Sequence, residues 1–194
     1  MSALLEKLYL AAGLGIVLVL LASFGLHTEA AGTNAAQYTT GVMIFLHVIS
    51  GILWIGLLWY FNFVQIPTMP TIPAELKPGV SKYIAPRALF WFRWSALATV
   101  VTGLLVAWMR GYIHEALTLQ PPAVTIGTGM WMALFMAFNV WFIIWPNQKK
   151  ALGIVAVDDA KKAAAARTAM LASRVNFVLS WPMLYCMVGQ GTIG

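Results

Sequence analysis

The sequence predicts an all-α integral membrane protein with five transmembrane helices, and three observations support this fold class. Hydrophobic residues make up 61% of the 194 residues, and charged residues only 9%. The apolar residues form long runs, each close to the roughly 20 residues that a helix needs to cross a bilayer. The runs lack the strict alternation of a barrel strand. Because lipid admits only helices or closed barrels, helices are predicted.

The four later runs hold the polar residues at membrane depth, whereas the first carries no strongly polar residue. We interpret that first run as a retained helix and not a signal peptide, because it is long and Glu6 precedes it. We therefore expect a four-helix core plus one added N-terminal helix, in a single domain of residues 1–194. The predicted spans are Leu8–Leu26, Gly41–Ile66, Ala88–Met109, Gly127–Trp145 and Val175–Ile193.

The basic residues predict the orientation of the chain. Ten of the 12 Lys and Arg residues precede the first span or lie in the loops after the second and fourth spans. Since Lys and Arg are retained on the cytoplasmic side, the N-terminus is predicted inside and the C-terminus outside. This pattern indicates a multi-pass protein of the bacterial inner membrane. The net charge of +6 follows the membrane, so no nucleic-acid partner is expected.

Two loops have sequence patterns that predict their local structure. The second loop, 67–87, contains five prolines and is expected to be irregular. In the fourth loop, Asp158 and Asp159 precede an Ala-rich segment with scattered basic residues. Acidic residues at the positive end of a helix are typical of a helix start, so we expect a helix that continues into the last span. Pro182 is expected to kink that span.

His47 is the most informative candidate for a site. It lies about two turns inside the second span, where a titratable side chain is costly without a partner. Gly51 follows at one helical turn and removes bulk, so a flat macrocycle could lie against this face with His47 as a haem ligand. The alternative is a structural histidine that donates to a backbone carbonyl or hydroxyl, with Thr99, Thr102 and Ser180 as candidate partners. His27 and His114, near the ends of other spans, form a weaker candidate metal site.

A second group of candidate site residues is predicted near the inner interface, around Arg93. Arg93 lies between Trp91 and Trp94. It could be held by amide oxygens and stacked on tryptophan as a structural latch, or receive an anion such as a lipid phosphate. The amides are Asn62, Gln65, Asn176 and, deeper in the fourth span, Asn139.

The sequence also argues against several function classes. It has no paired carboxylates in the spans, which makes proton pumping or cation transport poorly supported. It has no cysteine pair, no CxxCH haem attachment, no Gly-rich nucleotide loop and no nucleophile motif. No catalytic residue is therefore predicted.

Four segments resemble the membrane region of PuuD-type urate hydroxylases, the urate oxidase N-terminal domain family. They are HVISGILWIGLLWYFNF (His47–Phe63), WFRWSALATVVTGLL (Trp91–Leu105), FNVWFIIWPNQKKALG (Phe138–Gly153) and SRVNFVLSWPMLYCMVG (Ser173–Gly189). The resemblance covers roughly residues 40–190 and implies an inner-membrane bundle associated with redox chemistry. Full-length members carry a C-terminal cytochrome c domain, and this chain ends at Gly194, so we expect the membrane region without it.

Members of this family also tend to have a histidine shortly after the PML block, where this chain reads Gly189-Gln190-Gly191-Thr192. We therefore expect first an accessory subunit of a membrane redox or energy-converting complex. It would bind lipid, contact other integral membrane subunits and need no cofactor or catalysis of its own. The alternative is an oxidoreductase module that binds haem b through His47 and an outer-side partner, His27 or His114. A carrier for a small solute is a weaker alternative.

Overall fold

The computed structural model describes residues 5–191, apart from the side chains of residues 29 and 30. The described residues form helices and no strand, which confirms the all-α fold. The chain divides into two compact units, Met1–Val42 and Met43–Gly194. We call the second of these the bundle unit. That the two units form one domain, as predicted, stays a prediction.

The first unit contains α2 (Leu8–Leu26), α3 (Thr28–Thr33) and the start of α4 (Ala35–Tyr60). The bounds of α2 are those predicted for the first span. Within this unit, the Tyr38 hydroxyl lies 2.8 Å from the Ser23 hydroxyl. The rings of Tyr38 and Phe24 lie 6.3 Å apart. These contacts hold α2 and the beginning of α4 together.

The proline-rich second loop is helical over most of its length, so the expectation of an irregular loop was wrong. After α4 come a π-helical segment η1 (Phe61–Gln65), α5 (Ile66–Thr68) and a 3₁₀ turn η2 (Met69–Thr71). Beyond residues 72–76 the chain is helical again in α6 (Lys77–Gly79), π-helical η3 (Val80–Ile84) and α7 (Ala85–Met109). Pro67, Pro70, Pro78 and Pro86 occupy the first or second position of their elements. Only Pro78 lies at the start of a continuous helical stretch, where the missing backbone N–H costs no hydrogen bond; Pro67, Pro70 and Pro86 lie within such stretches.

Each π-helical segment precedes a proline, and the proline explains the wide turn. Segment η1 precedes Pro67, η3 precedes Pro86, and η4 (Asn139–Ile144) precedes Pro146. A proline ring collides with the carbonyl four residues earlier and leaves it without an N–H partner. Widening that turn by one residue lets the helix continue. Consequently α9 (Val124–Phe138) passes through η4 into α10 (Trp145–Ala151) as one helical stretch.

The last long helix, α11 (Asp159–Gly189), begins as predicted from its acidic start. The Asp158 carboxylate accepts a hydrogen bond of 2.8 Å from the Lys161 backbone N–H, and its second oxygen lies 2.9 Å from Lys161 Nζ. The Lys161 side chain lowers the pKa of Asp158. Pro182 lies inside α11. The predicted end of this span, Ile193, lies outside the described residues.

Among residues 5–191, four helical stretches are long and apolar enough to cross a membrane: Leu8–Leu26, Ala35–Thr71, Lys77–Met109 and Val124–Ala151. The prediction of a multi-pass membrane protein is therefore supported, and α11 is not among the four. The reason lies in its composition, because Arg174, which is exposed, and the polar residues Ser173, Asn176 and Ser180 reduce its mean hydropathy. The last three residues are buried inside the bundle and do not face outward.

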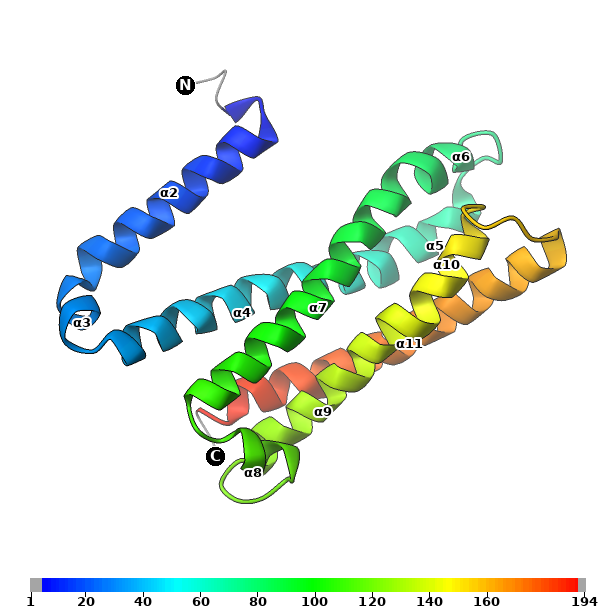
Figure 1. The fold of residues 1–194 in the computed structure, drawn as a ribbon. Helices are drawn as coiled ribbons and strands as arrows, with labels where there is room; N and C mark the ends of the chain where they lie inside the picture. The colour runs from blue at the N-terminus through cyan, green and yellow to red at the C-terminus, as the bar shows by residue number, and fades with distance from the viewer. Residues whose placement is uncertain (1–4, 192–194) are drawn as a thin grey trace. The chain divides into compact units, whose positions relative to one another are not determined.

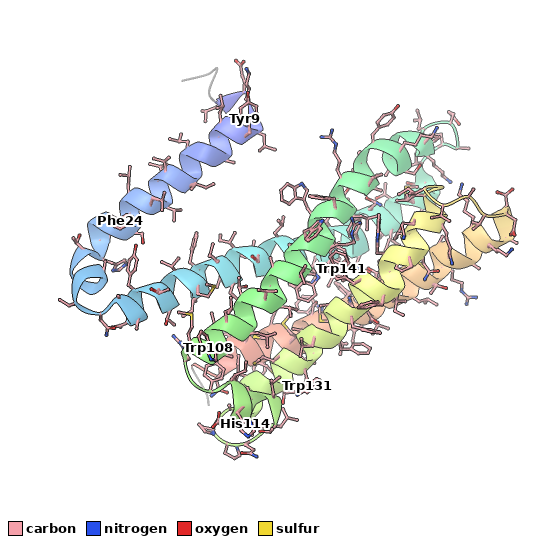
Figure 2. All side chains as sticks on the ribbon, viewed as in Figure 1. Tyr9, Phe24, Trp108, His114, Trp131 and Trp141 are labelled. Carbon is pink, nitrogen blue, oxygen red and sulfur yellow. The ribbon has the colours of Figure 1, made fainter. Side chains whose placement is uncertain are left out.

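In the bundle unit, α9 packs against α11 and α7, and the later part of α4 contributes Trp54, Ile55 and Leu58 to the same core (Figure 1). A short helix, α8 (Ile113–Leu117), closes one end, and α10 lies at the other. We call these the α8 end and the α10 end. His114 and Trp131 lie at the α8 end (Figure 2). Gly111 has φ +76° and ends α7 in a conformation that favours glycine.

The buried apolar residues form two clusters. The larger contains Trp54, Leu58, Phe92, Met136 and Met183 among others, contributed by α4, α7, α9 and α11. The smaller lies at the α8 end and contains Ala107, Ala116, Ala123, Ile126 and Met130. Members of both clusters line a cavity that separates them.

Candidate functional site

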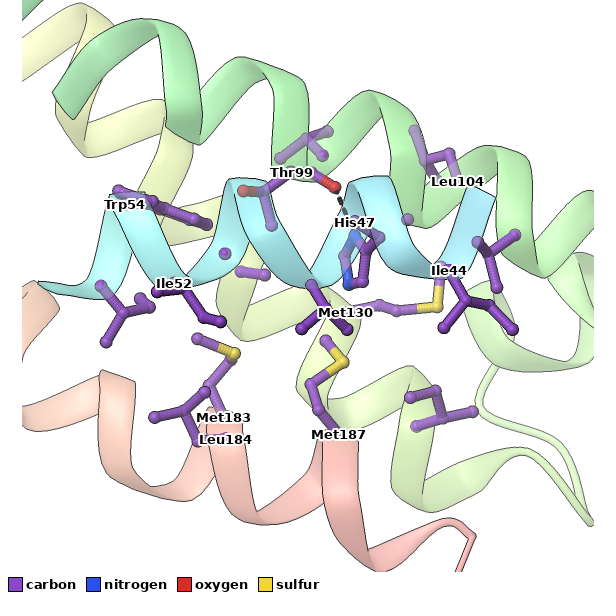
Figure 3. A pocket seen from close by; sticks show the side chains of 18 of the residues that line it. Ile44, His47, Ile52, Trp54, Thr99, Leu104, Met130, Met183, Leu184 and Met187 are labelled. Carbon is purple, nitrogen blue, oxygen red and sulfur yellow. Dashed lines mark hydrogen bonds between the residues drawn. The ribbon is translucent and has the colours of Figure 1, made fainter. Parts of the chain in front are cut away.

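The cavity of about 650 Å³ is the candidate site, and its volume suits a cofactor-sized ligand. Its walls come from α4, α7, α9 and α11 and are mainly aliphatic. Three methionines, Met130, Met183 and Met187, share one side of it and lie across the cavity from His47 (Figure 3). Arg110 and Tyr112, which follow α7, bring polar groups to the α8 end of the cavity.

The imidazole of His47 is fixed by α7. Its Nδ1 lies 2.9 Å from the Thr99 carbonyl oxygen and 3.3 Å from the Thr102 hydroxyl oxygen. The expectation that His47 bonds to a neighbouring span is thereby confirmed, with Thr99 and Thr102 as partners. Ser180, the third predicted partner, instead accepts from Trp59 Nε1 at 3.0 Å.

The partners of Nδ1 determine the state of the other ring nitrogen. A carbonyl oxygen only accepts, so Nδ1 carries the proton and donates it. In neutral His47, Nε2 then holds a lone pair. No residue in the described part of the chain hydrogen-bonds to Nε2, and the ring lies on the cavity side of α4 (Figure 3). A histidine that ligates a metal has the same arrangement, with its second nitrogen fixed by a carbonyl.

Gly103 makes this position of the ring possible. A Cβ atom on Gly103 would lie 2.8 Å from Cε1 of His47 and 3.1 Å from Nδ1. The sequence analysis missed Gly103, because its significance depends on the register between α4 and α7. Gly51, which the analysis did select, also lines the cavity, and a Cβ there would lie 3.8 Å from the Thr99 methyl group. Gly103 therefore allows α4 and α7 to approach beside His47, whereas a Cβ atom at Gly51 would make only an ordinary van der Waals contact.

Tyr112 lines the cavity, and the pKa of its phenol differs from the usual value. Burial raises the pKa of its hydroxyl, and the positive charge of Arg110 opposes this shift. The phenol is therefore protonated at neutral pH and available as a hydrogen-bond donor beside the Arg110 guanidinium. Together the two side chains could hold an acidic group of a ligand whose apolar part fills the cavity.

The other predicted histidines do not join this site. His114 lies on α8, and His27 belongs to the first unit, directly after α2. Residues 5–191, side chains 29 and 30 aside, contain no group of three or more His, Cys, Asp or Glu side chains that could hold a metal ion. The pairing of His27 with His114 stays a prediction.

The amides form bonds among the helices but do not hold Arg93. Asn139 Nδ2 donates to Asn176 Oδ1 at 3.0 Å, and Asn176 Nδ2 donates to the Met136 carbonyl at 2.9 Å. Asn62 Nδ2 donates to Ser173 Oγ at 3.0 Å and to the Leu58 carbonyl at 2.8 Å. The predicted amide latch around Arg93 was therefore wrong, because no hydrogen bond joins Arg93 to these amides, although Asn62 Oδ1 is itself buried without a partner in the described residues. Gln65 Oε1 is buried and has no partner within the described residues.

Arg93 stacks on tryptophan, as predicted, but on residues of another helix. Its Cζ lies 3.4 Å from the ring centroid of Trp145 and 5.9 Å from that of Trp141. Its neighbours in sequence are Trp91 and Trp94. Those two side chains are largely exposed.

Replacing Asn176 with leucine is expected to lower bundle stability, since it leaves the buried Asn139 amide without its acceptor. An unsatisfied buried polar group costs about 1–3 kcal/mol. Thermal unfolding of the purified protein in detergent would measure this loss. The double variant Asn139→Leu/Asn176→Leu removes both groups and should recover most of it. A double variant that is less stable than the single variant would contradict this explanation.

The chain resembles one known family over part of its length. The urate oxidase N-terminal family model matches residues 113–191, which run from α8 to just beyond α11. The resemblance predicted from the sequence is confirmed over these residues. No curated protein and no solved structure matches the chain. The match includes Asn139, Asn176 and the cavity methionines, while His47 and Arg93 precede it.

Proposed function

We propose that the chain is a five-span protein of the bacterial inner membrane and that its bundle unit binds haem b in the cavity beside His47. One observation carries the haem proposal. Nε2 of His47 has its lone pair free on the side of an apolar cavity of about 650 Å³, while Nδ1 is held by the Thr99 carbonyl. The match of residues 113–191 to the urate oxidase N-terminal family supports a role in redox chemistry.

The fifth span in this proposal is α11. Its polar residues Ser173, Asn176 and Ser180 are 6%, 0% and 0% exposed. Asn176 and Ser180 hydrogen-bond to other helices, and Ser173 accepts from Asn62. Polar groups that are satisfied inside a bundle do not oppose insertion as lipid-facing groups would. The low mean hydropathy of α11 is therefore compatible with a spanning helix.

The orientation can be tested with reporter fusions. A reporter inserted between α10 and α11 should behave as cytoplasmic, because this loop lies among the basic residues. A reporter fused after Gly194 should be active only as a periplasmic protein. Alkaline phosphatase and green fluorescent protein make a suitable pair, since each is active on one side of the membrane. The reverse pattern would refute the orientation.

The residues of the cavity fit a haem. Nε2 of His47 would hold the haem iron, and a methionine thioether from Met130 or Met187 could supply a further ligand, since haem iron also accepts methionine. Arg110 and Tyr112 would bind the propionates. The mainly apolar walls would suit the apolar faces of the macrocycle. A bound haem b supplies one-electron transfer, and the protein sets its potential through the axial ligands and the low polarity of the cavity.

An absorption spectrum of the purified protein, with and without dithionite, tests the proposed cofactor. We expect a Soret band that shifts and sharpens on reduction. Replacing the ligating methionine with leucine should keep the haem but lower its midpoint potential, since methionine ligation raises it. Met183→Leu serves as the control because Met183 also lines the cavity. A protein that binds no haem when expressed with added precursor and reconstituted with haemin would refute the proposal.

A second candidate function is an accessory subunit without its own cofactor, in contact with other integral membrane subunits. Its support is the row of large side chains that remain exposed on α7 and α9. Trp91, Trp94 and Trp131 are 56%, 47% and 50% exposed. A featureless spectrum together with co-purifying membrane subunits would favour this function.

A further inference from the structure

We propose that Arg93, Trp141 and Trp145 form a phosphate-binding site at the α10 end of the bundle unit. This site is separate from the cavity beside His47 and does not depend on the proposed haem. Arg93 is only 9% exposed, yet Nε and Nη1 of its guanidinium are buried and lack a hydrogen-bond partner in the described part of the chain. Buried N–H groups of a guanidinium require an acceptor, because an unsatisfied buried donor is costly.

The surroundings of Arg93 supply further donors and positive charge. The Trp141 indole Nε1 is buried and has no partner among the described residues. Its ring centroid lies 5.9 Å from Arg93 Cζ, so the Trp141 ring is a neighbour of the guanidinium. Lys149 Nζ lies 5.6 Å from the ring centroid of Trp145, the ring on which Arg93 stacks at 3.4 Å. Two cations therefore share one indole.

No carboxylate balances these charges. The side chains of residues 29 and 30 are not described. The rest of residues 5–191 contains one ion pair, which joins Lys161 to Asp158. The amide oxygens that were expected to hold Arg93 do not reach it. The stacking on Trp145 offsets part of the cost of burying the guanidinium, but it leaves the N–H groups unsatisfied. An anion from outside the chain would complete the site.

The position of the cluster favours a phosphate as that anion. Trp145 begins α10, and Lys149 and Lys150 follow on the same helix. In the proposed orientation this end meets the inner headgroups, where tryptophan and basic residues gather and anionic lipid phosphates are abundant. A guanidinium and an indole N–H can donate to separate oxygens of one phosphate group. The phosphate could belong to a phospholipid headgroup or be free in solution.

Thermal unfolding of the delipidated full chain tests the site. Three additions distinguish the source: dioleoyl-phosphatidylglycerol, inorganic phosphate, and dioleoylglycerol as a lipid with no phosphate. We expect phosphatidylglycerol to raise the unfolding temperature at concentrations where dioleoylglycerol does not. Arg93→Gln should weaken this effect by about tenfold in concentration, as expected for the loss of charge-assisted hydrogen bonds. Protection by phosphate alone would identify a free phosphate as sufficient.

Two further variants keep the test decisive. Arg87→Gln removes an exposed arginine six positions earlier, just inside the start of α7, and should bind phosphatidylglycerol as the original chain does. Trp141→Phe keeps the ring but removes the indole donor, and should weaken binding several-fold. If Arg93→Gln does not fold, the Trp141→Phe variant tests the site in its place. The proposal is overturned if neither lipid nor phosphate protects, if Trp141→Phe and Arg93→Gln respond as the original chain does, or if Arg87→Gln loses as much as Arg93→Gln.

Discussion

Replacing His47 with alanine is expected to abolish haem binding while leaving the bundle folded. The proposed ligand is Nε2, which has no hydrogen-bond partner in the described residues, so its loss leaves no buried group unsatisfied at the cavity. The Thr99 carbonyl loses one of its donors, and the effect on stability should be small. Residues that only orient a metal ligand change affinity by about 10–100-fold, so removing the ligand itself should exceed that range. The Soret absorbance per protein after reconstitution with haemin measures the loss.

The matched control for this variant is His114→Ala. His114 lies on α8 and does not line the cavity, so its replacement should leave the Soret band unchanged. Adding imidazole to the His47→Gly variant should restore part of the band, since a free imidazole can occupy the vacated space. Full haem occupancy in the His47→Ala variant would remove the central argument for this function.

Replacing Gly127 with alanine is expected to produce the largest loss of stability of any single methyl addition in α9. A Cβ atom at Gly127 would lie 2.9 Å from the carbonyl carbon of Ala116 and closer still to its oxygen. These are backbone atoms of α8, which cannot turn away as a flexible side chain can. Overpacking of this kind costs about 1–3 kcal/mol and occasionally more. The unfolding temperature in detergent should fall by several degrees.

Gly41→Ala provides the control for this prediction. Gly41 lies inside α4, and a Cβ atom there would meet nothing within 4 Å. Alanine in a helix interior is favoured over glycine by about 0.5–1 kcal/mol, so Gly41→Ala should be neutral or slightly stabilising. If Gly127→Ala unfolds at the same temperature as Gly41→Ala, α8 does not pack against α9 as described.

The sequence predicted the elements whose signals are local. The bounds of α2 follow from an uninterrupted apolar run, and the start of α11 follows from the capping aspartate, Asp158. The bond from His47 to α7 followed from a general requirement, because a buried imidazole needs a partner. In each case the information lies within one segment or one residue type.

The features that the sequence did not predict depend on the packing of separate helices. The prolines of the second loop suggested irregular chain, because a pattern of prolines does not show that each begins a helical turn. Arg93 and the amides lie at similar depth, but depth alone does not give the face of a helix. Asn176 faces Asn139, while Arg93 faces Trp145. The role of Gly103 likewise required the register of α7 against α4.

The wide turns before Pro67, Pro86 and Pro146 have a consequence for comparing this chain with others by helical wheels. Each π-helical turn adds one residue to its helix, so all later side chains rotate by about 100° relative to an uninterrupted helix. A wheel drawn through Asn139–Ile144 therefore assigns the residues of α10 to the wrong face. Deleting one residue within such a turn would rotate the following segment as a whole. Substitutions near these turns change one side chain, but single-residue insertions or deletions change an entire interface.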